Sequence, residues 1–302
     1  MTVKSCITSM RLRTLPLSLA GIIFGVALAA TVVELRASVV ITLMLTAALL
    51  QILSNLSNEL GDALHGTDAA SERQGMHYSI MDGEMTVEQM KGLIAVIAAL
   101  CCVSGLAMVW CSFGTVFALA PLAILALGAV TIWAAMHYTL GKNPYGYRGL
   151  GDIFVFIFFG LVPCLGGAYL CSHTFVPAWI LPAAAVGLWS VGVLNVNNIR
   201  DMKTDAATRV TVAIKLGEKR SRVYQSILIC AGWVMMAAFI GLIIHSDHGF
   251  VLRRLIVFIT IPLFAMHLTG VGKRKDKELD PMLPLLVMST FATSILFCIA
   301  LS

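Results

Sequence analysis

Nine long apolar runs occupy most of this chain and leave few folds open to it. Each run is about 20 residues long, which is the length that a helix needs to cross the hydrocarbon core of a bilayer. The runs are continuous rather than alternating, and a segment in lipid must satisfy its backbone hydrogen bonds internally, so we expect helices. The expected spans cover residues 15–33, 37–57, 92–110, 115–136, 153–171, 178–197, 223–244, 251–271 and 281–301.

The composition agrees with an all-α polytopic membrane protein whose nine transmembrane helices form one bundle. Of the 302 residues, 59% are hydrophobic and only 12% are charged, whereas a soluble domain carries about 25% charged residues. A soluble enzyme, a disordered tail and a secreted disulfide scaffold are therefore excluded. Most of the eight cysteines lie in or beside apolar runs and are expected as small buried hydrophobic residues. We expect a single domain over residues 1–302.

The distribution of charge predicts the orientation in the membrane. With the N-terminus placed in the cytoplasm, 18 of the 21 Lys and Arg residues lie on that side, and only Arg36, Arg253 and Arg254 lie outside. This asymmetry predicts a multi-pass protein of a bacterial inner membrane with its C-terminus outside. The basic residues lie between apolar runs rather than on one face, so nucleic acid is not an expected partner. Of the 16 acidic residues only Glu34 and Asp247 lie outside, which predicts a polar mouth that faces the cytoplasm.

The first polar cluster follows the second predicted span. If the helix continues beyond residue 57, then Asn55, Asn58, Glu59 and Asp62 recur at i, i+3, i+4 and i+7 and share one face. Asp68 follows a few residues later. Carboxylate and amide oxygens are the ligands that hard cations prefer, so Asn58, Glu59, Asp62 and Asp68 are candidate metal ligands.

The second polar cluster follows the sixth predicted span. Asn197, Asp201 and Asp205 are spaced four apart, so they are expected on one helical face as candidate metal ligands. Mg²⁺ held by one or two carboxylates keeps its other positions for phosphate oxygens and water. Two such clusters could hold two ions and bind a diphosphate. The alternative is that these carboxylates are solvated residues at the membrane edge, but two clusters on the same side favour a functional site.

Basic residues in the same layer complete this pattern. Lys142, Arg200 and Arg209 are placed to bind the outer oxygens of a phosphate, although each could instead anchor a helix end. The segment 137–152 is rich in Gly and Tyr, and an aromatic belt at the membrane surface explains its tyrosines. Asp152, at the start of a span, is a functional candidate because ionisable groups are costly there.

Together these residues resemble the UbiA-type intramembrane prenyltransferases, and the resemblance covers nearly the whole chain. The Asn58/Asp62 and Asp201/Asp205 pairs are specific to that superfamily, and the Pro-Tyr-Gly-Tyr stretch at 144–147 resembles its naphthoate branch. One departure is Glu59, where the family usually has an aspartate. The resemblance rests on residues 10–16, 51–56, 58–68, 138–152, 195–205 and 215–217.

The resemblance implies a Mg²⁺-dependent aromatic polyprenyltransferase. A polyprenyl diphosphate would ionise to an allylic cation, which alkylates 1,4-dihydroxy-2-naphthoate with loss of CO₂, giving demethylmenaquinone and diphosphate in menaquinone biosynthesis. It implies catalytic roles for Asn58, Asp62, Asp201, Asp205 and Lys142. It implies substrate- and cofactor-binding roles for Tyr138, Arg200, Arg209 and Asp152.

Two other functions stay open at the level of the sequence. A related prenyltransferase with another aromatic acceptor, such as 4-hydroxybenzoate, would share both polar clusters. A secondary transporter would also have many spans and buried acids, but its polar groups usually lie near the membrane midplane, at broken helices. Release of diphosphate from a prenyl donor distinguishes an enzyme from a transporter.

The predicted orientation can be tested with reporter fusions. A reporter fused to the C-terminus should register outside the cytoplasm, and one inserted within residues 203–220 should register in the cytoplasm, because positive charge is retained inside. A cytoplasmic C-terminus would contradict the count of nine spans. The span at 251–271 is then the first to re-examine, since it begins near two arginines.

Overall fold

The computed structural model describes residues 2–66, 79–246 and 252–302 of the chain. It is almost entirely helical within these ranges, and it divides into two compact units. Unit 1 comprises residues 1–15, 41–151 and 202–211, and unit 2 comprises residues 16–40, 152–201 and 212–302. The expectation of a single domain over the whole chain stays a prediction.

Nine helical segments within the described residues are long and apolar enough to cross a membrane. This confirms the all-α class and the number of spans expected from the sequence. The segments are Val3–Ala30, Ala37–His65, Val87–Phe113, Leu119–His137, Gly151–Ser172, Pro177–Arg200, Glu218–Ser246, Leu252–Lys273 and Asp276–Leu301.

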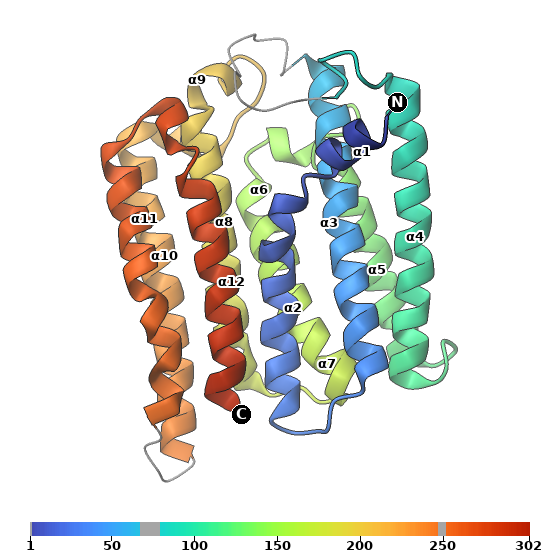
Figure 1. Ribbon diagram of the computed structural model, residues 1–302, viewed down its shortest axis with the longest axis vertical. Helices are drawn as coiled ribbons and strands as arrows, with labels where there is room; N and C mark the ends of the chain where they lie inside the picture. The colour runs from blue at the N-terminus through green and yellow to red at the C-terminus, as the bar shows by residue number, and fades with distance from the viewer. Residues whose placement is uncertain (1, 67–78, 247–251) are drawn as a thin grey trace. The chain divides into compact units, whose positions relative to one another are not determined.

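Unit 1 is built on three long helices, which Figure 1 shows in blue to green. They are α3 (Ala37–His65), most of which belongs to this unit, α4 (Val87–Phe113) and α5 (Leu119–His137). Leucines of α3 pack against Met90 and Ile94 of α4 in the apolar core of the unit. The short elements of the unit are α1 (Val3–Met10), η1 (Leu12–Thr14), η2 (Tyr145–Tyr147) and α9 (Met202–Asp205).

Unit 2 is organised around α8 (Ile180–Arg200), which packs against the fifth span, α10 (Val212–Ser246) and α12 (Met282–Leu301). In Figure 1, α10 runs beside α11 (Ile261–Lys273). Trp189 of α8 lies in the core, 5.0 Å from the ring centre of Phe264. The other elements are α2 (Leu15–Ala30), α6 (Gly151–Val155), η3 (Phe156–Gly166), α7 (Gly167–Ser172), η4 (Pro177–Trp179), η5 (Leu252–Thr260) and η6 (Asp276–Leu279).

The fifth span is not a regular α-helix. Its middle part, η3, is a π-helix that contains Pro163. Proline has no backbone N–H and its ring crowds the preceding turn, so a wider turn is the physical consequence of its place inside a helix. Gly21 of α2 allows the two helices to approach here, because a Cβ at Gly21 would lie 2.9 Å from the Phe159 carbonyl oxygen.

Two helix ends determine how the polar clusters are presented. The helix α3 continues to His65, so Asn55, Asn58 and Asp62 do lie on one helix, as expected. The helix α8 ends at Arg200, and Asp201 has non-helical backbone angles. The expectation that Asn197, Asp201 and Asp205 share one helical face is therefore wrong, because α8 contains only the first of them.

Glycines set a close helix contact in unit 2, and one of them provides a test. A Cβ at Gly160 would overlap Gly187 and lie 2.8 Å from the Ala183 carbonyl oxygen. Gly160→Ala should lower the free energy of unfolding by about 1–3 kcal/mol, since backbone atoms cannot move aside as a side chain can. Thermal unfolding of the purified protein in detergent measures this.

Gly128 of α5 is the matched control, because a Cβ there meets nothing within 4 Å among the described residues. Gly128→Ala should be neutral or slightly stabilising, since Ala has the higher helix propensity. Equal stability of the two variants would contradict the close contact at Gly160.

Candidate functional site

In unit 1, Asp62 lies near the end of α3 at the centre of a buried polar network. Its Oδ1 accepts a hydrogen bond from the Tyr147 hydroxyl at 2.6 Å and lies 3.8 Å from Nη1 of Arg209. The Arg209 Nη2 donates to Asp205 Oδ1 at 2.8 Å. The Asp62 and Arg209 side chains are 9% and 11% exposed, and that of Asp205 is fully buried. One guanidinium therefore joins two carboxylates that come from distant parts of the sequence.

The turn at η2 holds the segment that carries Arg209. The backbone N–H of Val210 donates to the Tyr147 carbonyl oxygen at 3.0 Å. The guanidinium carbon of Arg209 lies 5.5 Å from the centre of the Tyr147 ring, so the same tyrosine contacts the arginine through its π face and the aspartate through its hydroxyl.

In this network Arg209 stays charged and keeps one hydrogen-bond donor without an acceptor among the described residues. Burial disfavours the charged guanidinium, but the carboxylates of Asp62 and Asp205 outweigh burial and raise the pKa of Arg209 above its ordinary value. The Arg209 Nε is buried and has no hydrogen-bond acceptor among the described residues. A buried N–H without an acceptor is costly, so this nitrogen suits an anionic oxygen of a ligand.

Asn58 lies one turn before Asp62 and contacts Thr139, which follows α5. The Thr139 hydroxyl has two acceptors at hydrogen-bond distance, the Ser57 carbonyl oxygen at 2.9 Å and Asn58 Oδ1 at 3.2 Å. Gly61 makes this approach possible, because a Cβ at Gly61 would lie 2.5 Å from the Thr139 hydroxyl oxygen. The amide oxygen of Asn58 and the carboxylate of Asp62 thus have fixed places on α3.

Glu59 has different partners from Asp62. Its Oε1 accepts hydrogen bonds from the Ser9 hydroxyl at 3.2 Å and from the Ile80 N–H at 3.4 Å, and the residue is 1% exposed. Glu59 therefore joins α3 to α1 and to the chain before α4, and its role as a metal ligand stays a prediction. Asp68 lies outside the described residues.

In unit 2, Arg200 gathers the oxygens of the second cluster. Its Nε and Nη2 donate to the two carboxylate oxygens of Asp201 at 2.9 and 2.7 Å, and Nη2 also donates to Asn197 Oδ1 at 2.8 Å. Nη1 donates to Asp280, which precedes α12, at 2.8 Å. The side chains of Arg200 and Asp201 are 8% and 13% exposed. An arginine thus binds the candidate ligands here as well.

Asp152 lies in the first turn of α6 and accepts a hydrogen bond from the Tyr224 hydroxyl of α10 at 2.9 Å. Both groups are partly buried, so this pair fixes α6 against α10 near the end of the span. Tyr224 was not predicted, because it stands near the start of the expected span at 223–244 and belongs to neither polar cluster.

Tyr138 and Lys142, which have roles implied by the resemblance, follow the fourth span. The helix α5 ends at His137, and Gly141 has a φ of +101°, so the two residues lie beyond the regular helix and their roles stay predictions. The Tyr138 ring packs edge-on against Tyr145 at 5.4 Å between ring centres. Lys142 is exposed on the connecting loop.

The donor sets of both clusters fit a magnesium ion that is completed by substrate. No group of three or more His, Cys, Asp and Glu residues that could hold a metal ion gathers among the described residues. Asn58 and Asp62 on α3, and Asn197 and Asp201 at the end of α8, each supply one amide oxygen and one carboxylate. Mg²⁺ is usually held by one or two carboxylates together with water and phosphate oxygens.

Sequence reasoning missed the two residues that organise unit 1 around Asp62. Tyr147 was assigned to an aromatic belt and Thr139 was not singled out. The Pro-Tyr-Gly-Tyr stretch was recognised as a motif, so a signal was present for Tyr147. Its hydrogen-bond partner could not be predicted from the sequence, because 85 positions separate Tyr147 from Asp62.

The helical architecture and these polar clusters define an integral membrane protein of one family. The family model described as the UbiA prenyltransferase family matches residues 18–295, and the chain belongs to this family. It is 38% identical over 300 residues to the 1,4-dihydroxy-2-naphthoate octaprenyltransferase of Escherichia coli, covering 99% of this chain and 95% of that protein.

Solved structures show the same fold. A UbiA homologue from Aeropyrum pernix K1 superimposes with a TM-score of 0.69 at 17% identity, over 94% of this chain and 98% of that one. A UbiA homologue from Archaeoglobus fulgidus bound to GPP and Mg²⁺ superimposes with a TM-score of 0.62 at 14% identity, over 96% and 99% of the two chains. At these identities the likeness concerns the fold alone.

Removal of the Tyr147 hydroxyl tests whether the network around Asp62 matters for prenyl transfer. Tyr147→Phe should lower kcat/KM about tenfold, because Asp62 loses a charge-assisted hydrogen bond. Tyr145→Phe is the control, since the Tyr145 hydroxyl donates to a backbone carbonyl, that of Ala134. If the two variants have the same kcat/KM, the hydrogen bond does not position Asp62 for the reaction.

Proposed function

We propose that this protein transfers a polyprenyl group from a polyprenyl diphosphate to 1,4-dihydroxy-2-naphthoate. The observation that carries the proposal is the match over nearly the whole chain to a relative named for this acceptor, within the UbiA prenyltransferase family. The buried network of Asp62, Arg209 and Asp205 supports it, because a diphosphate needs cations and oriented donors where its charge develops.

Magnesium is the cofactor that we propose. Two observations support it: the Archaeoglobus fulgidus homologue of the same fold is bound to GPP and Mg²⁺, and the oxygen donors of both clusters suit this ion. When bound, Mg²⁺ neutralises the charge that builds on the departing diphosphate. Asn58 and Asp62 would hold it in unit 1, and Asn197 and Asp201 would hold it in unit 2.

The arginines are suited to the phosphate oxygens. Arg209 stays charged between Asp62 and Asp205 and presents its Nε, which has no acceptor among the described residues. A guanidinium also binds phosphate through two parallel hydrogen bonds. Arg200 would serve in the same way once Asp201 turned to a metal ion. Lys142, which is exposed, would reach a phosphate only as a point charge from the loop.

The reaction that we propose involves no net redox change. The carbon–oxygen bond of the donor breaks heterolytically, and diphosphate leaves with the electron pair. The allylic cation alkylates the ring, and loss of CO₂ leaves its bonding pair on the ring. The direct product is therefore the hydroquinone form, and a separate two-electron oxidation gives demethylmenaquinone. The apolar spans would exclude water, which would otherwise trap the cation.

A donor-by-acceptor assay in membranes tests the proposed function. Octaprenyl diphosphate is supplied with either 1,4-dihydroxy-2-naphthoate or 4-hydroxybenzoate, and the release of diphosphate and the mass of the lipid product are measured. We expect Mg²⁺-dependent release with the naphthoate alone, and a product mass that shows the loss of CO₂. Turnover with 4-hydroxybenzoate instead would overturn the acceptor, and no release with any acceptor would overturn prenyl transfer.

The proposed magnesium ligands predict how activity changes when a single carboxylate charge is removed. Asp62→Asn and Asp201→Asn should each abolish most activity, by about 10²-fold or more at limiting Mg²⁺, because the ion loses a charged oxygen ligand. Asp205→Asn should matter less, since Asp205 is bound to Arg209. Excess Mg²⁺ should partly restore the variants that lose a ligand. Wild-type activity of either variant at limiting Mg²⁺ would contradict the assignment.

A further inference from the structure

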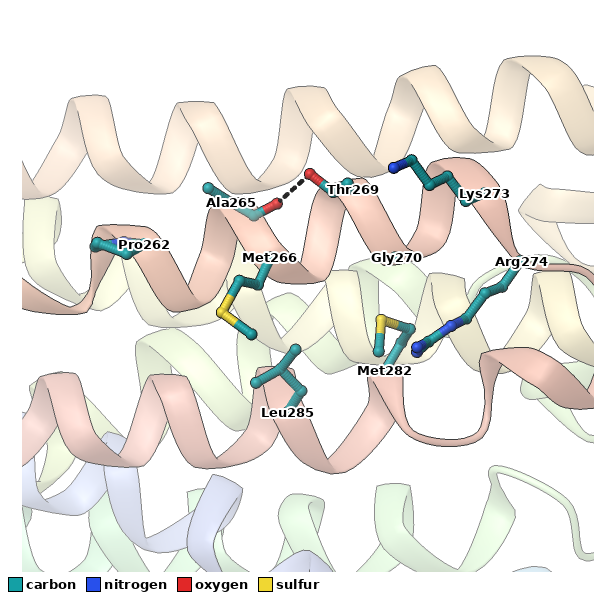
Figure 2. Close-up of a pocket in the computed structure, with 9 residues that line it drawn as sticks. All are labelled: Pro262, Ala265, Met266, Thr269, Gly270, Lys273, Arg274, Met282 and Leu285. Atoms are coloured by element: carbon teal, nitrogen blue, oxygen red, sulfur yellow. Dashed lines mark hydrogen bonds between the residues drawn. The ribbon is translucent and has the colours of Figure 1, made fainter.

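An open groove lies between α11 and α12 of unit 2, apart from the residues assigned to the proposed reaction. Its volume is about 500 Å³, and Figure 2 shows the side chains that line it. Most of them are apolar and include Ala265 and Met266 of α11 and Leu285 of α12. Met266 is 60% exposed, so the groove presents an apolar surface that an apolar ligand can bury.

The floor of the groove is fixed where the two helices meet. A Cβ at Gly270 would overlap the sulfur atom of Met282, so the absence of a side chain at Gly270 lets Met282 pack under α11. Gly270 and Met282 both line the groove. The cavity is therefore a built feature of this helix pair.

One end of the groove is basic. Figure 2 shows Lys273 and Arg274 at one end and Pro262 at the other. Neither Lys273 nor Arg274 has a carboxylate within ion-pair distance among the described residues, and the Arg274 Nη1 is buried there without an acceptor. The Arg222 Nη2 donates to the Arg274 carbonyl oxygen at 2.8 Å, and the Arg222 Nη1 also has no acceptor within that part of the chain.

The negative groups nearby have partners other than Lys273 and Arg274. Asp280 is paired with Arg200 at 2.8 Å. Glu218 is paired with Arg222 at 2.7 Å, and Glu278 accepts a hydrogen bond from the backbone of Lys275. The end of the groove thus presents two cationic side chains, Lys273 and Arg274, and the Arg274 Nη1 is a buried guanidinium nitrogen without an acceptor among the described residues. This is the chemistry of a phosphate site, since an arginine presents its donors in a fixed geometry to phosphate oxygens.

The length of the groove matches one leaflet of a bilayer. Pro262 and Lys273 are eleven positions apart on α11, which is about 16 Å at 1.5 Å per residue. Half of the hydrocarbon core is about 15 Å thick. A ligand that fills both parts of the groove needs a phosphate at one end and an apolar chain of that length.

We propose that this groove is a binding site for an anionic membrane phospholipid, whose phosphate is bound by Lys273 and Arg274 and whose acyl chain lies along Met266 and Leu285. A free phosphate would leave the apolar part uncovered, and a zwitterionic lipid would bring its own cation to the basic end. Basic pockets between transmembrane helices bind anionic head groups in this way. The site is independent of the proposed reaction.

Native mass spectrometry of the full-length protein in detergent tests the proposal. Phosphatidylglycerol and phosphatidylcholine with the same acyl chains are supplied in equal amounts, and the lipid retained per protein is measured. The wild type should retain phosphatidylglycerol preferentially. The double variant Lys273→Gln/Arg274→Gln should weaken this retention by about tenfold, because two cations next to the phosphate are lost.

Two matched controls separate the site from general effects. Lys219→Gln/Arg220→Gln removes the same charge from exposed positions of α10 outside the groove, and it should retain the lipid as the wild type does. Ala265→Trp fills the apolar part and should weaken retention, whereas Ala126→Trp, at an exposed position of α5, should not.

Several outcomes would overturn the proposal. Equal retention of the two lipids, or equal loss in the groove variants and their controls, would show that the groove does not select an anionic lipid. Displacement of the lipid by millimolar inorganic diphosphate would indicate a site for free phosphate instead. Displacement by octaprenyl diphosphate, with a raised KM for the donor in the Lys273→Gln/Arg274→Gln variant, would assign the groove to the donor.

Discussion

The lipid environment offers no water to backbone or charged groups, and the other features of this structure follow from that constraint. Backbone hydrogen bonds must close within each segment, so the apolar runs form helices. Several buried charged groups lie near the ends of the spans and next to opposite charges. Asp62, Arg209 and Asp205 satisfy one another in unit 1, as Arg200 and Asp201 do in unit 2.

In both units a buried arginine compensates the charge of a buried carboxylate. In each unit an asparagine near the end of a helix is followed four residues later by an aspartate, and a buried arginine is the counter-ion. In the function that we propose, the arginine would hold the carboxylate in place until a metal ion and a diphosphate bind, and it would then be available to the phosphate. Loss of an arginine would leave buried carboxylates uncompensated, which costs more than the ion pair itself contributes. These arginines are therefore as much part of the folded state as of the proposed reaction.

Close packing of helices stabilises the apolar parts of the protein, as ion pairs stabilise the polar parts. Gly160, Gly187 and Gly21 bring backbones together where a side chain would not fit. Dispersion contacts supply much of the association energy of helices in lipid, so small residues at the crossings stabilise the bundle. Where two helices do not close fully, as between α11 and α12, the gap is lined by methionine and leucine and has the character of a lipid-facing groove.

The sequence by itself determined the all-α class, the nine spans and the polar cluster on α3, because these depend on local hydropathy and helical periodicity. Only the tertiary structure decided which groups meet. Asp205 lies next to Arg209 instead of continuing the face of Asp201, because α8 ends at Arg200. Tyr147 reaches Asp62, and Lys142 stays on an exposed loop, because α5 ends at His137 and the chain turns through η2. Periodicity describes a residue's place on its own helix, whereas these contacts join residues far apart in the chain and depend on where each helix stops.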